Sequence, residues 1–278
     1  MTPAAAILVA LAGLALSRPL PGATAVTVAP KLSHVVVVIE ENHSLAEVQG
    51  NSSAPYINSL MKSGANFTNS FGVAHPSQPN YLALFSGSVQ GQTSDSCPHT
   101  FGATNLGAQL RAAGKSFTSY AESLPYAGDP VCTSGPYARK HVPSTDFSDL
   151  PASVNHTFAT FPKSTFTALP AVSFIAPNLN NDMHDGSIAA GDAWLKSNLS
   201  GYVTWAKANN SALIVVWDED DYSQSNKVPT FIVGAHVKTG SYNETTNHFR
   251  LLRTIEAIFS LPGIGSANTY APITDVWN

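Results

Sequence analysis

Apolar and polar residues follow one another along this chain in blocks of two kinds. Short apolar runs rich in β-branched residues predict buried strands at residues 34–39, 67–73, 116–120, 171–175, 212–217 and 230–233. Apolar residues spaced three and four apart predict helices at 54–63, 80–85, 106–113, 188–208 and 247–260. Strands that alternate with helices are typical of a three-layer α/β domain with a mainly parallel central sheet.

The middle of the chain shows neither the apolar runs of strands nor the apolar spacing of helices. Residues 123–168 carry Pro, Ser and Asp throughout, which predicts a long irregular segment of the kind that shapes a substrate site. Cys97 and Cys132, the two cysteines of the chain, flank the beginning of this segment. In an exported protein two cysteines favour one disulfide, whereas in a cytoplasmic protein they would be two free thiols.

The first residues resemble a secretory signal. The segment 3–16 is apolar, and Ala23-Thr24-Ala25 fits a signal-peptidase site, although no basic residue precedes the apolar run. We therefore expect a signal peptide at 1–25 that is cleaved after Ala25, a secreted protein, and a single catalytic domain at 26–278. The apolar run is too short for a comfortable membrane span, so no integral membrane segment is expected.

Composition narrows the class of partner. The 278 residues can bury one sizeable core, and only 12% of them are charged, against roughly 25% in typical soluble domains. The formal net charge of −4 gives no indication of a nucleic-acid groove or a polybasic membrane patch. We expect a monomer that acts on a small-molecule or lipid substrate.

Two predicted strands end in clustered oxygen ligands. The strand at 34–39 is followed by Glu40, Glu41 and Asn42, and the strand at 212–217 runs into four carboxylates, Asp218 to Asp221. Ligands bind at the carboxyl ends of strands in open α/β sheets, and clustered carboxylates repel one another unless a cation or protons offset the charge. If the two strand ends meet, Glu41, Asn42, Asp218 and Glu219 would surround one divalent cation of unknown identity. The alternative for the acidic run is a solvated turn.

A serine lies at the predicted start of a helix. The segment His75-Pro76-Ser77 precedes the helix at 80–85, and the N-terminus of a helix attracts anions such as phosphate. A Ser77 hydroxyl beside a metal ion would lose its proton easily and could attack phosphorus. From this motif alone, a helix cap is the favoured role of Ser77. No G-x-S-x-G motif is present, so an ordinary serine hydrolase is disfavoured.

Three further clusters contain histidine. His184 follows the strand at 171–175 and would donate a proton to the leaving group, unless it is simply an exposed loop residue. His248 begins the last predicted helix, where the residue taken alone favours a helix-end role over a catalytic one. Arg139-Lys140-His141 is the one tight basic trio, either a phosphate contact or a solvated loop.

Four motifs in order resemble the phosphoesterase family of bacterial acid phosphatases and phospholipases C. They are Glu40 to Asn42 (EEN), His75 to Phe85 (HPSQPNYLALF), Asn181 to Ile188 (NDMHDGSI) and Trp217 to Asp221 (WDEDD), and the likeness extends over about residues 34–277. The resemblance implies an alkaline-phosphatase-like fold and a metal-assisted phosphoserine mechanism. A sulfatase is disfavoured, because Tyr81 stands where its signature requires arginine.

The resemblance also implies roles for individual residues. It pairs Glu41 and Asn42, then Asp218 and Glu219, as metal ligands. It makes Ser77 the nucleophile and gives the site Asn80 as a phosphoryl contact, together with His184 and His248. Relatives carry an Asp-His pair soon after the acidic motif, where this chain has Tyr222-Ser223-Gln224, which affects the expected number of metals and the substrate preference.

The function expected from these residues is a secreted acid phosphatase that hydrolyses phosphate monoesters. Phospholipases C of this family generally carry extra C-terminal domains, for which this chain has no room, so the monoesterase is preferred over a phosphodiesterase. A secreted phosphate-binding or metal-binding protein without turnover is the third alternative.

Overall fold

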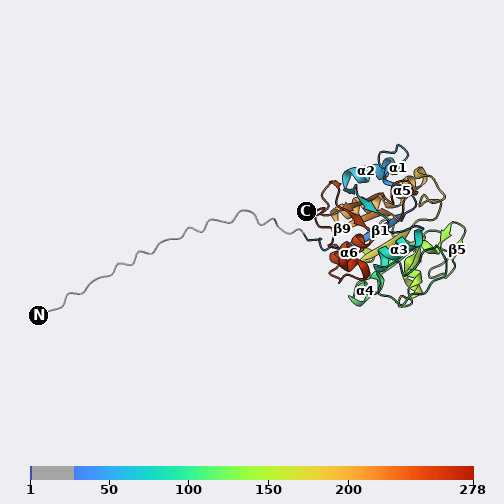
Figure 1. Ribbon diagram of the computed structural model, residues 1–278, viewed down its shortest axis with the longest axis horizontal. Helices are drawn as coiled ribbons and strands as arrows, with labels where there is room; N and C mark the ends of the chain where they lie inside the picture. Colours follow the sequence, from blue (N-terminus) through green and yellow to red (C-terminus); the bar gives the residue numbers. More distant parts are fainter. Residues whose placement is uncertain (2–27) are drawn as a thin grey trace.

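The computed structural model describes Met1 and residues 28–278 of the chain. The predicted signal peptide and its cleavage site at Ala25 lie, apart from Met1, outside the described residues. An eight-stranded sheet in the order β11-β2-β10-β9-β1-β8-β4-β7 forms the centre of the molecule (Figure 1). Its strands are β1 His34–Glu40, β2 Ala65–Phe67, β4 Phe117–Ala121, β7 Asn155–Thr157, β8 Val172–Ala176, β9 Ser211–Trp217, β10 Thr230–Gly234 and β11 Gly240–Tyr242.

The five strands from β9 to β7 are parallel, and β10 runs antiparallel to both β9 and β2. β1 lies between β8 and β9, and every residue from Val35 to Ile39 is at most 2% exposed. Val35, Val37 and Ile39 belong to one hydrophobic core, whereas Val36 and Val38 belong to the other. A strand covered on both faces needs apolar side chains at every position, which explains the unbroken run of valines.

Helices cover both faces of the sheet, as Figure 1 shows, with α2 and α5 above it and α3, α4 and α6 below it. Their bounds are α2 Pro55–Ser63, α3 Ser77–Ser86, α4 Leu106–Ala112, α5 Ile188–Ala208 and α6 His248–Ile258. The expected three-layer α/β architecture with a mainly parallel sheet is thereby confirmed.

Most predicted elements lie within a few residues of the observed ones. One difference matters for the site: α3 begins at Ser77, three residues before the predicted helix start, so Ser77 is the first helical residue. The segment predicted as irregular contains the edge strand β7 together with short turns. The remaining elements are the helix α1 Leu45–Val48, the strands β3 Ser70–Phe71, β5 Thr133–Ser134, β6 Tyr137–Ala138 and β12 Thr246–Asn247, and 3-10 turns at Arg139–His141, Pro143–Asp146, Ala152–Val154, Phe158–Thr160, Phe166–Ala168 and Gly265–Thr269.

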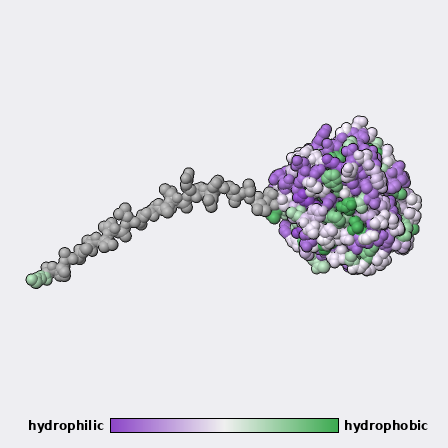
Figure 2. All heavy atoms as spheres, in the orientation of Figure 1, coloured by the Kyte–Doolittle hydropathy of each residue, from purple (hydrophilic) through white to green (hydrophobic). Residues whose placement is uncertain are grey.

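The surface is mixed in polarity. On the face shown in Figure 2, hydrophobic residues form small separate groups among hydrophilic ones. None of the helices in the described part of the chain combines the length and the apolar composition that crossing a membrane requires.

Candidate active site

The carboxyl ends of β1 and β9 bring the two predicted ligand pairs together. Glu40 is in register with Trp217, and the backbone N–H of Asp218 donates to the Glu40 carbonyl at 3.0 Å. The backbone N–H of Asn42 then donates to Asp218 Oδ1 at 3.3 Å. The residues that follow these two strands therefore lie side by side, although they are far apart in the sequence.

Ser77 meets this cluster from the start of α3. Its Oγ lies 3.0 Å from Glu41 Oε2, 3.0 Å from Glu219 Oε1 and 3.5 Å from Asn42 Oδ1. Ser77 is 1% exposed, and the N-cap of α3 is Pro76, with no side chain capping the helix. The hydroxyl thus faces the carboxylates, and the alternative that Ser77 serves as a helix cap does not describe this structure.

The side chains around Ser77 suit a hard divalent cation. The Asn42 side-chain oxygen faces Glu41 Oε2 and Glu219 Oε1; with the amide reversed, its nitrogen would donate to both at 3.2 Å. Asp218 Oδ2 is buried without a hydrogen-bond partner. A cation between these oxygens would satisfy all of them with the ligand type that Mg²⁺, Ca²⁺ and Mn²⁺ prefer.

Without a compensating charge, the carboxyl groups of this cluster favour their protonated forms. Burial, followed by repulsion from Asp218 and Asp182, raises the pKa of Glu41 well above its ordinary value. Burial and then Glu219 do the same to the pKa of Asp218. Among the residues that the structure describes, no three His, Cys, Asp or Glu side chains alone form a metal-binding group. A cation here would therefore require the oxygens of Asn42 or Ser77 as well.

The second oxygen of Glu41 contacts two aromatic residues. The Tyr81 hydroxyl donates to Glu41 Oε1, and His141 Nε2 lies 3.2 Å from the same oxygen. The His141 ring stacks on Tyr81 at 4.9 Å between centroids, and its Nδ1 lies 3.3 Å from Asp182 Oδ2. Burial holds the pKa of His141 well below its usual range, so the imidazole is neutral. The sequence analysis did not predict the contact of Tyr81 with Glu41, although Tyr81 lies one helical turn after Ser77.

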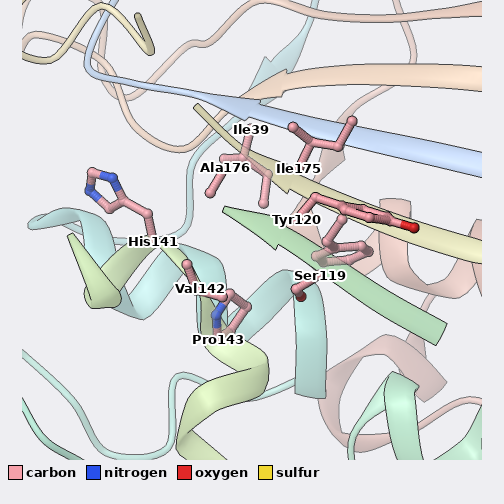
Figure 3. A pocket seen from close by; sticks show the side chains of 9 residues that line it. Ile39, Ser119, Tyr120, His141, Val142, Pro143, Ile175 and Ala176 are labelled. Atoms are coloured by element: carbon pink, nitrogen blue, oxygen red, sulfur yellow. The ribbon is translucent and has the colours of Figure 1, made fainter. Parts of the chain in front are cut away.

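His141 is also one of the residues that line a small cavity at the end of the sheet. Ile39, Tyr120 and Ile175 line this cavity, and in Figure 3 the imidazole points away from them. The cavity has a volume of about 10 Å³, which is room for roughly one water molecule and far too little for a phosphate ester.

His75 supports Glu219, a contact that the sequence analysis did not predict. Its Nδ1 pairs with Glu219 Oε2, and its Nε2 lies 3.4 Å from Asp220 Oδ1. Tyr222 stacks on the His75 ring at 3.9 Å between centroids and is itself exposed. The sequence signal that could have indicated a role for His75 in the site is its position two residues before Ser77.

The predicted phosphoryl contact Asn80 holds the backbone before α3. Its Oδ1 accepts from the N–H groups of Val73 and Ala74 at 2.8 and 3.1 Å. Its Nδ2 donates to the carbonyls of Ala74 and Pro76 at 2.9 and 3.3 Å. Since the amide has two donors and two acceptor positions, all are in use, and Asn80 positions the loop that carries His75.

The two predicted catalytic histidines lie in different surroundings. The His184 side chain is 29% exposed, its Nδ1 contacts Asp185 Oδ1 at 2.7 Å, and its ring centroid lies 6.1 Å from that of His141. His248 is buried, and its Nε2 bonds to the backbone carbonyl of Asp218 at 2.6 Å. Burial lowers the pKa of His248 to about 4. His184 therefore lies at the rim of the site, whereas His248 supports Asp218 from behind.

The acidic run and the basic trio each divide into separate roles. Asp220 accepts hydrogen bonds from the N–H groups of three residues of the following loop, and Asp221 is exposed. The solvated-turn alternative is therefore right for Asp221 alone. Arg139 pairs with buried Asp146 at 3.1 Å, and Lys140 pairs with Asp95 at 2.7 Å.

Comparison with known proteins places this chain in a family. The model of the Phosphoesterase family matches residues 51–262. The chain is 53% identical to the phosphatidylinositol-3-phosphatase of Mycobacterium tuberculosis over 250 residues, which cover 89% of this chain and 84% of that protein. It is 29% identical to the phosphate-repressible acid phosphatase of Penicillium chrysogenum over 75% of this chain, and it spans about half (55%) of the length of that relative.

Solved structures support the fold. A protein in the alkaline phosphatase superfamily from Vibrio parahaemolyticus superposes with a TM-score of 0.59 at 12% identity, covering 89% of this chain and 72% of that one. A putative sulfatase from Bacteroides thetaiotaomicron gives a TM-score of 0.61, also at 12% identity, covering 88% and 74%. The expected alkaline-phosphatase-like fold is confirmed.

Proposed function

We propose that the chain is a secreted acid phosphatase that cleaves phosphate monoesters through a phosphoserine intermediate at Ser77. The chain belongs to the phosphoesterase family and is a phosphoric ester hydrolase. The observation that carries this proposal is the position of Ser77 Oγ, 3.0 Å from both Glu41 Oε2 and Glu219 Oε1. A nucleophile needs a group beside it that takes its proton, and both carboxyl groups lie within hydrogen-bonding distance of the Ser77 hydroxyl.

The proposed reaction begins when Ser77 Oγ attacks the phosphorus and the bond to the ester oxygen breaks. Glu41, Asn42, Asp218 and Glu219 would hold a divalent cation, which supplies a lower pKa for the serine hydroxyl and offsets the phosphoryl charge. His184 at the rim would protonate the leaving oxygen, because its exposed ring can reach a substrate whereas His248 is buried behind Asp218. Water then attacks the phosphoserine and releases inorganic phosphate.

The names of the relatives support a proposal for the substrate class. The Mycobacterium tuberculosis relative is named a phosphatidylinositol-3-phosphatase, and the fungal relatives are named acid phosphatases. We infer a monoester of a lipid headgroup or a small molecule as the substrate. The disulfide between Cys97 and Cys132 supports export to an oxidising compartment.

One set of assays tests the proposal. The purified protein is incubated with an aryl phosphate monoester, an aryl phosphate diester and phosphatidylinositol 3-phosphate vesicles across acidic and neutral pH, with and without a chelator. We expect the monoesters to be hydrolysed faster than the diester, and we expect the chelator to abolish this hydrolysis.

Each other outcome points to a different function. Faster release from the diester would identify a phosphodiesterase of the phospholipase C type. Phosphate or metal binding without product release would identify a binding protein. Monoester hydrolysis that survives complete removal of metal would contradict the metal-assisted step.

A further inference from the structure

The N-terminus of α3 offers fewer donors to a phosphate group than a helix start normally does. Pro76 and Pro79 have no backbone N–H. The N–H of Gln78 donates to Asp95 Oδ1 at 2.9 Å. Of the first three helical residues, Pro79 has no N–H and Gln78 donates its N–H to Asp95, so only the N–H of Ser77 is left for an anion at the predicted site.

The other oxygen of Asp95 holds a lysine. Lys140 Nζ lies 2.7 Å from Asp95 Oδ2, and its side chain is 17% exposed. One carboxylate therefore connects the Lys140 ammonium to the backbone amide that follows Ser77. Burial works against the charged form, but the bond to Asp95 and the nearby carboxylates of Glu41 and Asp218 raise the pKa of Lys140. The ammonium is charged at the edge of the cluster that contains the nucleophile.

We propose that Lys140 binds an oxygen of the substrate phosphoryl group and of the phosphate product, and that Asp95 is the residue that positions it. An ammonium carries three N–H donors, and Asp95 takes one of them. Lys140 thus supplies the donors that α3 lacks. This inference rests on the proposed phosphatase function and names the protein group that recognises the phosphate.

The neighbours of Lys140 in the sequence explain why it alone of the basic trio has this role. Arg139 donates to Asp146 and to the carbonyls of Pro130 and Thr145, so its guanidinium is committed to structure. His141 lies between Glu41 and Asp182. Of these three side chains, Lys140 is the charged one whose single hydrogen-bond partner among the described residues is a carboxylate, Asp95, which leaves two of its three N–H donors for a ligand.

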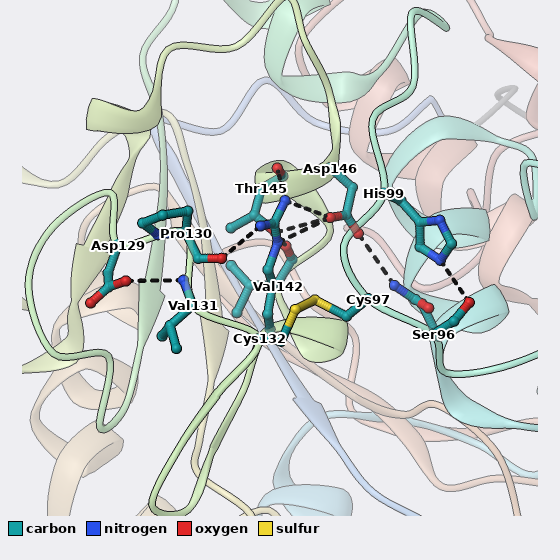
Figure 4. Close-up of a disulfide and its surroundings, with 12 residues drawn as sticks. Ser96, Cys97, His99, Asp129, Pro130, Val131, Cys132, Val142, Thr145 and Asp146 are labelled. Carbon is teal, nitrogen blue, oxygen red and sulfur yellow. Dashed lines mark hydrogen bonds and ion pairs between the residues drawn. A yellow bond between two sulfur atoms is a disulfide. The ribbon is translucent and has the colours of Figure 1, made fainter.

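The disulfide braces both members of the pair. Cys97 lies two residues after Asp95, and Cys132 accepts a hydrogen bond from the Arg139 N–H through its carbonyl at 2.9 Å. Figure 4 shows the bond joining the two segments beside Asp146. Asp95 and Lys140 therefore sit on backbones that are covalently linked, which keeps the ammonium in place.

The test compares Lys140→Met with Lys207→Met, a matched control at the exposed end of α5. Steady-state kinetics on an aryl monoester and inhibition by inorganic phosphate are measured for both variants. Lys140→Met is expected to lower kcat/KM by about 10²-fold and to weaken inhibition by phosphate at least about tenfold, with Lys207→Met unchanged. Wild-type kcat/KM together with wild-type phosphate inhibition in Lys140→Met overturns the proposal.

Two further variants separate a phosphate contact from a structural role. Lys140→Arg keeps the charge and is expected to restore part of the lost phosphate affinity. Asp95→Asn is expected to raise KM more than it lowers kcat, because Lys140 keeps its charge but loses its fixed position. If Lys140→Met does not fold, the Asp95→Asn variant decides, and unchanged KM and phosphate inhibition there refute the inference.

Calorimetry with inorganic phosphate distinguishes failure of the Lys140 proposal from failure of the proposed phosphatase function. If the wild-type protein binds phosphate without hydrolysing any monoester, the phosphatase proposal fails, yet the Lys140 contact is still measured by the difference in affinity between wild type and Lys140→Met. Equal phosphate affinity in an active wild type and an active variant rejects only the Lys140 contact.

Discussion

His141 Nε2 lies 3.2 Å from Glu41 Oε1, and both side chains are buried. Tyr81 donates its hydroxyl to the same oxygen, so Glu41 Oε2 is the one that reaches Ser77 at 3.0 Å. The two oxygens of one carboxyl group thus have separate partners. A buried carboxylate fixed in this way presents one orientation to the nucleophile and to a cation, and the surrounding residues set that orientation.

Tyr81→Phe tests this arrangement. Removal of the hydroxyl leaves Glu41 Oε1 with His141 alone and frees the carboxyl group to rotate. Activity is expected to need a metal concentration about 10–100-fold higher than in the wild type. The concentration of metal that restores half of the activity after chelation measures this, with exposed Tyr126→Phe as the control. An unchanged metal requirement would show that the hydroxyl does not position Glu41.

Ser77→Ala should remove turnover. Without Oγ no phosphoserine forms, and we expect kcat to fall by about 10³-fold or more while the unfolding midpoint changes little. Ser59→Ala, an exposed serine on α2, is the matched control. Full activity in Ser77→Ala would mean that water or another group attacks the phosphorus.

Asp218→Asn should weaken metal binding. Asp218 contributes an unpartnered oxygen to the cluster, so replacement by an amide removes one anionic ligand. We expect the metal dissociation constant to rise about tenfold or more in a calorimetric titration. Asp221→Asn provides the control within the same acidic run, because Asp221 is exposed. Equal effects of the two substitutions would argue against a metal ligand at Asp218.

Loss of the disulfide should affect both stability and phosphate recognition. The bond between Cys97 and Cys132 closes a loop with a sequence separation of 35 residues, and such a cross-link contributes about 2–4 kcal/mol. The double variant Cys97→Ser, Cys132→Ser is expected to unfold at a lower urea concentration. Its KM should rise as well, because the segments of Asp95 and Lys140 are no longer joined. Reductant should reproduce both changes in the wild type and should have no effect on the double variant.

Glu256 gives a prediction for the pH dependence of stability. Burial raises the pKa of Glu256 to about 7 from its ordinary value of 4.5, against the opposing effects of the Ile264 N–H and Arg253. The folded chain therefore binds more protons than the unfolded chain between these two values, and the contribution of Glu256 to stability falls as pH rises through this window. Glu256→Gln lacks this titration.

Urea unfolding at pH 4.5 and pH 8 measures the effect. The free energy of unfolding of Glu256→Gln relative to the wild type should become more positive at the higher pH, whatever the sign of the offset at pH 4.5. A difference that is the same at both pH values would show that the pKa of Glu256 is the same in the folded and unfolded chains.

The fold was predictable because it follows from local patterns. The valines of β1 and the apolar run of β9 are short and β-branched, which favours strands covered on both faces. The long helical pattern predicted at 188–208 matches the observed bounds of α5, Ile188–Ala208. The start of α3 was misplaced by three residues, since two prolines in the segment obscured the helical pattern. That difference decides the orientation of Ser77.

The roles of the histidines were not predictable. His141 appeared in the sequence as one of three basic residues on a loop, yet it is a buried neutral side chain between two carboxyl groups. His248 appeared as a candidate catalyst, yet it bonds to the backbone of Asp218. The environment of an imidazole depends on residues that fold around it from distant parts of the chain.

The sequence by itself determined the central sheet except for its two edge strands β7 and β11, the helices that cover it, and the set of oxygen-bearing residues that follow β1 and β9, because these depend on hydrophobic periodicity and on near neighbours. Only the tertiary structure decided which members of that set meet. Ser77 is 36 positions from Glu41 and 142 positions from Glu219, and Lys140 is 45 positions from Asp95. Contacts across such separations are set by sheet order and helix packing, which bring the residues together only when the whole core has formed.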